Sequence, residues 1–146
     1  MKITQKGNYA VKAILDLAVH YEKGVVTIQA IAKRIDAPSK FLEQVLVELK
    51  RGGFIESRRG KIGWYRLSKS PKTITLGDVV KFIDGPLEPA PELNREHSER
   101  GDIYKRIFKP IWKKVFQVTS DVVNHVTFED LARQIESIRN VPTYYI

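Results

Sequence analysis

The sequence predicts a mainly α-helical fold with one small β-hairpin. Apolar residues recur at helical spacing along most of the 146-residue chain, and two short β-compatible runs flank a glycine-containing loop. This length fits one small domain with an appended helical element. The composition, 42% hydrophobic and 29% charged, is that of an ordinary globular protein.

The first two helices are predicted from an apolar face and from clear break points. Residues 8–22 form the first helix, which we expect to end at Gly24, and its apolar face consists of Val11, Ile14, Leu15, Ala18 and Val19. Thr27 is expected to cap a short second helix. That helix stops at residues 36–38, because Pro38 disfavours helical geometry in the residue before it.

A third helix and a hairpin follow. Ser39 is expected to cap the helix, and Gly52 and Gly53 end it. Its predicted buried face consists of Leu42, Val45, Leu46 and Leu49. Residues 54–57 and 64–67 are the predicted strands, and the loop between them contains the glycines that a hairpin turn needs.

The remaining helices are predicted from capping boxes and from a heptad pattern. A Thr-x-x-Asp box at residues 75–78 opens one helix, and a second box at 127–130 opens the last one. Between them, an acidic, proline-containing loop at 86–101 precedes apolar residues spaced four and three apart, which is typical of an a/d seam. Pro110 interrupts the seam, so we expect it either to kink the helix or to start a second piece.

The positive charge of the chain is concentrated in its first part. Residues 1–85 contain 16 Lys+Arg and 8 Asp+Glu, whereas residues 86–146 contain 9 of each. The first 85 residues therefore account for the whole net charge of +8. This asymmetry predicts a polyanionic partner, either a nucleic acid or an anionic membrane surface. The alternative is a basic surface that only keeps a small domain soluble.

The order helix, short helix, tight turn, helix and basic hairpin predicts a winged helix-turn-helix. Opposite its buried face, the third helix would expose Lys40, Glu43, Gln44, Val47 and Arg51. Gln suits adenine, Glu suits the amino group of cytosine, and Lys suits guanine or phosphate. The hairpin tip adds three cations that suit a narrow minor groove, namely Arg58, Arg59 and Lys61. The alternatives are a solvated helix face and an exposed charged turn.

Other classes of protein are not expected. With no cysteine, the chain has no disulfide, no thiol nucleophile and no cysteine-ligated metal. The three histidines are far apart and form no catalytic motif, so we expect no enzyme. His97, among Glu92, Glu96 and Glu99, is better explained by a solvated acidic loop than by a metal site, so no cofactor is expected. Neither a signal peptide nor a spanning segment is visible, which favours the cytoplasm and no membrane partner.

The seam in the long helix needs a surface to pack against. It either covers its own domain or forms a dimer interface, and both can hold. We expect the interface residues to be Tyr104, Phe108, Ile111, Trp112, Val115, Val118, Thr119 and Val122. The predicted organisation is a winged helix-turn-helix DNA-binding domain at 1–85, the acidic loop at 86–101, and a dimerisation helix with a C-terminal helix at 102–146.

Motifs along essentially the whole chain resemble the bacterial Rrf-two family of IscR-, NsrR- and CymR-like transcription regulators. The motifs are Thr4-x-Lys6-Gly7-x-Tyr9-Ala10, Phe41-Leu42-Glu43-Gln44, Leu49-x-x-x-Gly53, Arg59-Gly60-x-x-Gly63-x-Tyr65-x-Leu67 and Thr75-x-Gly77-Asp78-Val79-Val80. The resemblance implies a homodimeric regulator that binds palindromic promoter DNA, usually as a repressor. It places the DNA contacts at Lys6, Tyr9, Ser39, Lys40, Glu43, Gln44, Arg58, Arg59 and Lys61. We also expect Thr27 to contact DNA.

Regulation is where the chain departs from that family. Many members bind an iron–sulfur cluster through three cysteines in the loop before the long helix, and the corresponding loop here, 87–101, has none. We therefore expect either a small-molecule or protein effector that shifts the dimer between two arrangements, or constitutive DNA binding. The alternative function is a winged-helix protein-interaction or RNA-binding module.

Overall fold

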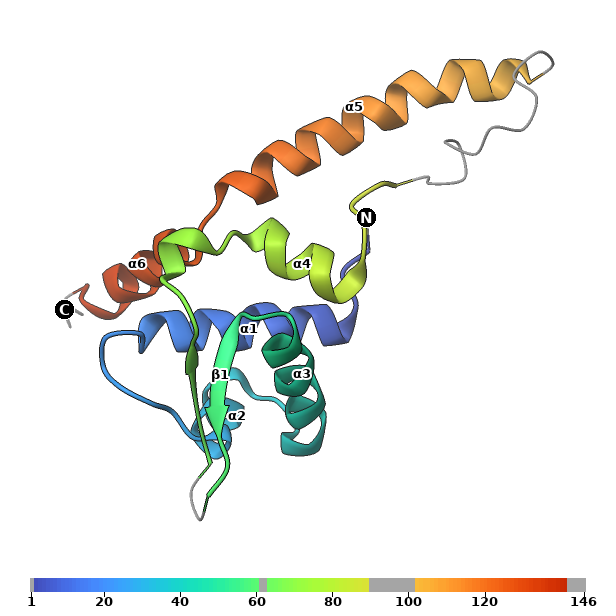
Figure 1. Cartoon of the computed structure of the whole chain (residues 1–146). Helices are drawn as coiled ribbons and strands as arrows, with labels where there is room; N and C mark the ends of the chain where they lie inside the picture. The colour runs from blue at the N-terminus through green and yellow to red at the C-terminus, as the bar shows by residue number, and fades with distance from the viewer. Residues whose placement is uncertain (1, 61–62, 90–101, 142–146) are drawn as a thin grey trace, which may run out of the picture.

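The computed structural model describes residues 2–60, 63–89 and 102–141. Its fold is mostly helical with one antiparallel hairpin, as predicted (Figure 1). The elements are α1 (Gln5–Val19), α2 (Ile28–Ile35), α3 (Ser39–Arg51), β1 (Ile55–Arg58), β2 (Trp64–Leu67), the short 3-10 helix η1 (Pro71–Thr73), α4 (Leu76–Asp84), α5 (Ile103–His125) and α6 (Phe128–Arg139).

Helix α1 is the centre of the core and packs against α2, α3, α4 and α6. It begins earlier than predicted, because the Thr4 hydroxyl accepts the Gly7 N–H at 3.0 Å and caps it. It also ends at Val19, well before Gly24. Of the predicted face, Ile14, Ala18 and Val19 are buried, whereas Val11 and Leu15 are only half-buried. Ala10, Ala13 and Leu17, outside that face, are buried as well. The two alanines leave room for neighbouring helices on more than one side of α1.

Helix α6 closes the core that α1 organises. Both predicted capping boxes are confirmed, and the one at Thr127 starts α6. The Phe128 ring is completely buried, and the Phe128 N–H donates to the carbonyl oxygen of Ile74 at 3.0 Å. Residues 1–85 do not close this core by themselves, because a helix more than 40 residues further along the chain fills part of it.

Helix α5 leans over α4 and extends beyond the rest of the molecule (Figure 1). It runs through Pro110 as one helix, so the proline does not start a second piece. Val123 is its one buried residue and packs in a small cluster with Val80 and Leu87. Among the described residues, no helix is long and apolar enough to cross a membrane.

Candidate nucleic-acid interface

The turn between α2 and α3 is made by three residues. Asp36 ends α2 in the left-handed region, with φ 53° and ψ 54°, which aspartate tolerates better than most residues. Pro38, not Ser39, occupies the N-cap of α3, and no side chain caps that helix. The prediction of a serine cap was therefore wrong. Because Ser39 is the first residue of α3 and is exposed, its hydroxyl is available to a partner.

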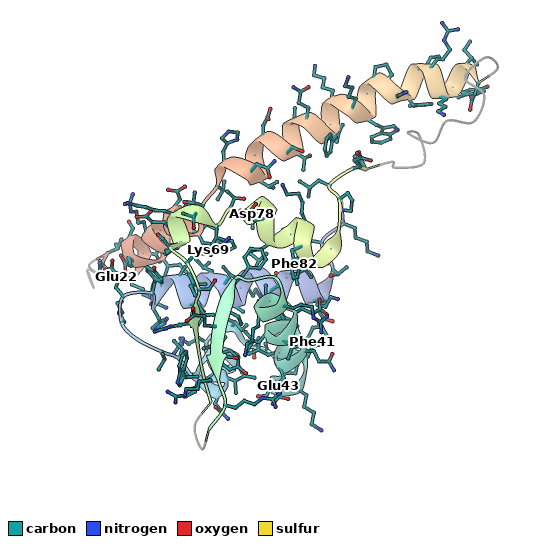
Figure 2. The ribbon with its side chains drawn as sticks, viewed as in Figure 1. Glu22, Phe41, Glu43, Lys69, Asp78 and Phe82 are labelled. Carbon is teal, nitrogen blue, oxygen red and sulfur yellow. The ribbon has the colours of Figure 1, made fainter. Side chains whose placement is uncertain are left out.

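Helix α3 has the two faces that the sequence predicted. The buried face is confirmed and consists of Leu42, Val45, Leu46 and Leu49. The opposite face is exposed and consists of Lys40, Glu43, Gln44, Val47 and Arg51. Figure 2 shows Glu43 on the part of α3 that lies away from α4. In Figure 1 strand β1 runs in the same direction, away from α4 and α5. The exposed polar face of α3 and the end of β1, which carries Arg58, therefore lie on one side of the molecule.

The start of α1 lies against α3. The Lys6 ammonium pairs with the Glu48 carboxylate of α3 at 3.1 Å. The Tyr9 ring packs edge-on against Phe41, with 5.4 Å between ring centroids. Both candidate residues of α1 are half-buried, so this helix end is fixed on α3 before any partner binds. Lys6 keeps further N–H donors beyond the one that Glu48 accepts.

The hairpin is tied to the helix-turn-helix by a bridge that was not predicted. The strands pair from Ile55 with Leu67 to Arg58 with Trp64, one residue later in β1 than expected. Val26 and Tyr65 exchange backbone hydrogen bonds of 3.0 and 2.8 Å. This bridge holds the segment before α2 beside β2. The adjacent Thr27 is half-buried, and its hydroxyl caps α2 by accepting the Ala30 N–H at 3.3 Å.

The arginines near the hairpin tip are unpaired. Arg58 and Arg59 are exposed, and neither forms an ion pair with any residue that the structure describes. Arg66 of β2, in contrast, pairs with Glu56 at 2.9 Å and lies over the Trp64 ring. The predicted contact at Lys61 lies outside the described residues. Among the described residues of the hairpin, the free positive charge near the loop is therefore carried by Arg58 and Arg59.

A groove of about 470 Å³ separates α3 from the hairpin. Its walls include Val47 and Lys50 from α3 and Ser57, Arg58, Arg59 and Tyr65 from the hairpin. Sequence reasoning did not select Lys50, Ser57 or Tyr65. The hairpin signal locates a turn, but it says nothing about which helix the strands face.

Charged residues of both α3 and the hairpin affect the pKa of the Tyr65 hydroxyl. Burial raises its pKa, the negative charge of Glu43 raises it further, and the positive charge of Arg59 opposes the rise. The phenol therefore stays protonated at neutral pH and remains an O–H donor. Glu43 of α3 and Arg59 of the hairpin are thus both close enough to Tyr65 to affect its pKa.

The described residues contain no group of three or more histidine and acidic side chains that could hold a metal ion. His97 and the three glutamates considered with it lie outside them. The whole sequence has no cysteine, and iron–sulfur clusters are held by cysteine thiolates. The donor set does not fit such a cluster.

The turn between α2 and α3, the exposed polar face of α3 and the basic hairpin beside it define the winged helix-turn-helix class of DNA-binding proteins. The chain belongs to the Rrf2 family, the Rrf-two family named above: the model of that family, described as an iron-dependent transcriptional regulator, matches residues 3–134.

Relatives and solved structures agree with this family. The chain is 28% identical over 100% of both chains to the HTH-type transcriptional regulator CymR of Bacillus subtilis. It is 32% identical to the regulator IscR of Pectobacterium carotovorum, over 93% of this chain and 82% of IscR. The solved structure of CymR, the global cysteine regulator of B. subtilis, superimposes on this chain with a TM-score of 0.76 at 30% sequence identity. The match covers 92% of this chain and 98% of the CymR chain. IscR of T. potens covers 99% and 95% at 29% identity and a TM-score of 0.77. The protein is thus a DNA-binding transcription regulator and not an enzyme.

Proposed function

We propose that the protein is a homodimeric repressor that binds palindromic promoter DNA in the cytoplasm without an iron–sulfur cluster. In this proposal residues 1–85 bind DNA and 86–101 connect, while 102–146 supply the dimerisation helix α5 and the C-terminal helix α6, which packs on the DNA-binding part. The observation that supports it best is the contrast between the two ends of the molecule. One side exposes polar and cationic residues on α3 and the hairpin, and α5 exposes a long apolar stripe.

The DNA-binding part of the proposal follows from the exposed side chains. Glu43 and Gln44 would face base edges in the major groove, while Ser39 and Lys40 would meet them or the nearby phosphates. Lys6 and Tyr9 would position α1 on the backbone, and Thr27 would contribute through its place at the start of α2. The hairpin arginines, with Lys61, would enter the adjacent minor groove.

The dimer part follows from the stripe on α5. Tyr104 is 72% exposed, Ile111 51% and Val122 59%, although all three are apolar positions of one helix face. The same stripe includes Phe108, Trp112, Val115 and Val118. Thr119 is half-buried and lies at its edge. A contiguous apolar surface of this kind marks an interface, and a second copy of α5 offers a matching one.

The effector part stays open between two routes. A small molecule or a partner protein would shift the dimer between DNA-competent and incompetent arrangements, or the protein would bind DNA constitutively. In either case the protein should purify colourless and bind DNA without iron or sulfide, because its chain offers no thiolate.

Selection of bound fragments from random duplex DNA tests the proposal. We expect enrichment of a two-fold symmetric sequence whose half-sites are about one helical turn, ~10 base pairs, apart. With roughly 6–10 phosphate contacts, the slope of log affinity against log salt should be about −5 to −9. In a reporter with this sequence across its promoter, the protein should lower transcription. No enriched sequence and a flat salt response would favour the protein-interaction or RNA-binding alternative instead.

A further inference from the structure

The groove between α3 and the hairpin is cationic and has an apolar wall. Lys50, Arg58 and Arg59 are exposed at its edges, and none of them pairs with a described acidic residue. No acidic side chain is among the described residues that line it. The lining also includes Val47, which is 56% exposed, and the half-buried Tyr65.

A groove lined by both cationic and apolar side chains matches one kind of occupant. A sugar–phosphate strand presents anionic oxygens at each phosphate and an apolar sugar edge between them. Cations left without internal partners are free to replace the counterions that such a strand releases. An uncharged ligand would leave three cations unpaired in the groove.

The position of the groove agrees with this occupant, and the argument here rests on the proposed function. If α3 enters a major groove and the hairpin tip enters the adjacent minor groove, one backbone strand must pass between them. The groove of about 470 Å³ is the space between these two elements.

We propose that this groove holds the sugar–phosphate strand between the two DNA grooves, with Lys50 and Tyr65 as phosphate ligands and Val47 against a sugar. The Lys50 ammonium donates to one phosphate, and Arg58 meets the same strand from the hairpin side. The Tyr65 hydroxyl donates from the floor of the groove, where its backbone is fixed by the bridge to Val26. These contacts read no bases, so they strengthen binding to every sequence equally.

Lys50→Gln tests the lysine, with Lys72→Gln as the matched control, because Lys72 is also exposed but lies on η1 outside the groove. Binding is measured on a duplex with the selected operator and on a scrambled duplex of equal length, across a salt series. We expect Lys50→Gln to weaken both complexes by a similar factor, about 5- to 10-fold, and to reduce the salt slope by about 0.9 per protomer. Lys72→Gln should leave both affinities and the slope unchanged.

A second measurement locates the contact. Single phosphates of the operator are replaced by neutral methylphosphonates, one position at a time. At one position per half-site the replacement should weaken binding of the original protein and of Lys72→Gln, but not of Lys50→Gln. Tyr65→Phe keeps the packed ring, so it should fold normally, bind both duplexes two- to fivefold more weakly and keep the original salt slope.

Two failures are distinguishable. If the unsubstituted protein binds operator and scrambled duplex equally well, sequence-specific regulation is wrong, while the Lys50 comparison on the scrambled duplex still tests the groove. If Lys50→Gln matches Lys72→Gln in affinity and slope, or no methylphosphonate position couples to Lys50, the strand does not lie in this groove.

Discussion

Two glycines show how single residues join the helices of this protein. The Asp84 carboxylate, at the end of α4, accepts the Thr4 N–H at 3.0 Å and the Thr4 hydroxyl, and a Cβ on Gly7 would overlap it. A Cβ on Gly52 would lie 2.7 Å from the Phe82 ring. Figure 2 shows Phe82 between α4 and the end of α3. Glycine is therefore required by close approach at both places.

Gly7→Ala should lower the free energy of unfolding by about 1–3 kcal/mol. Alanine gains up to about 1 kcal/mol in helix propensity over glycine, but its methyl group must displace the Asp84 carboxylate. Urea denaturation measures the change, and Asn8→Ala, at the exposed neighbouring position, is the control. A Gly7→Ala protein as stable as the original would mean that α4 moves aside without cost.

Glu43 should determine sequence selectivity rather than affinity. A carboxylate among phosphates is repelled unless a cytosine amino group donates to it. Glu43→Ala should therefore keep or raise the affinity for DNA and widen the set of sequences bound in the selection. Equal weakening on all sequences by Glu43→Ala would show that its role is structural.

Arg59→Ala should instead reduce the free energy of binding to DNA by about 1–3 kcal/mol.

Helix α6 illustrates how a local cap and a distant contact fix one element. Its capping box orients the first turn, and Phe128, the first residue of the helix, enters the core beside Ile74. The pKa of Asp130 lies below its ordinary value, mainly because its carboxylate is hydrogen-bonded to the Thr127 side chain. A hydrogen bond from the Thr127 backbone lowers this pKa further. The box thus depends on an ionised carboxylate.

The sign of the pH effect follows from that lowered pKa. The Asp130 contribution to stability is complete above the pKa of the unfolded chain and is lost as the pH falls through the lower pKa of the folded state. Thr127→Ala should raise the pKa of Asp130 toward its ordinary value and reduce this acid sensitivity. Carboxyl NMR titration measures the pKa, and Thr127→Ser, which keeps the hydroxyl, should leave it low. An unchanged pKa in Thr127→Ala would contradict the role of the threonine.

At the scale of the whole molecule, helix α5 leaves a long apolar stripe exposed. Its C-terminal half packs on the rest of the protein through Val123 and the half-buried Phe116. Its exposed stripe gives the proposed dimer a two-fold axis, which would place two copies of α3 on successive major grooves of one DNA face.

Sedimentation at micromolar concentration should find dimers of the original protein. Ile111→Asp combined with Val115→Asp should give monomers, because the carboxylates would be buried without partners. The monomer should bind DNA with roughly half the original salt slope, since it makes half the phosphate contacts. Gln117→Asp, an exposed position off the stripe, is the control and should remain dimeric. Monomers of the unsubstituted protein would overturn the heptad interpretation.

Local signals were enough to predict much of this fold. The two capping boxes, the break at residues 36–38, the buried face of α3 and the hairpin all depend on residues within a few positions of each other. Such signals act through backbone hydrogen bonding and side-chain periodicity, which a sequence displays directly. The exposed face of α3, and with it Glu43 and Gln44, followed from the same periodicity.

Other features depend on contacts between residues far apart in the chain. Asp16 lies on the buried side of α1 and is 8% exposed, because Arg34 of α2 binds both of its oxygens at 2.7 and 2.9 Å. The Lys6–Glu48 pair, the Val26–Tyr65 bridge, the burial of Phe128 and the groove beside Lys50 have the same origin. Hydrophobic periodicity and capping motifs are local signals, so they do not predict which helix packs against which strand. Packing of the whole chain sets these distances, since each contact forms only when elements separated by tens of residues bury their apolar faces together.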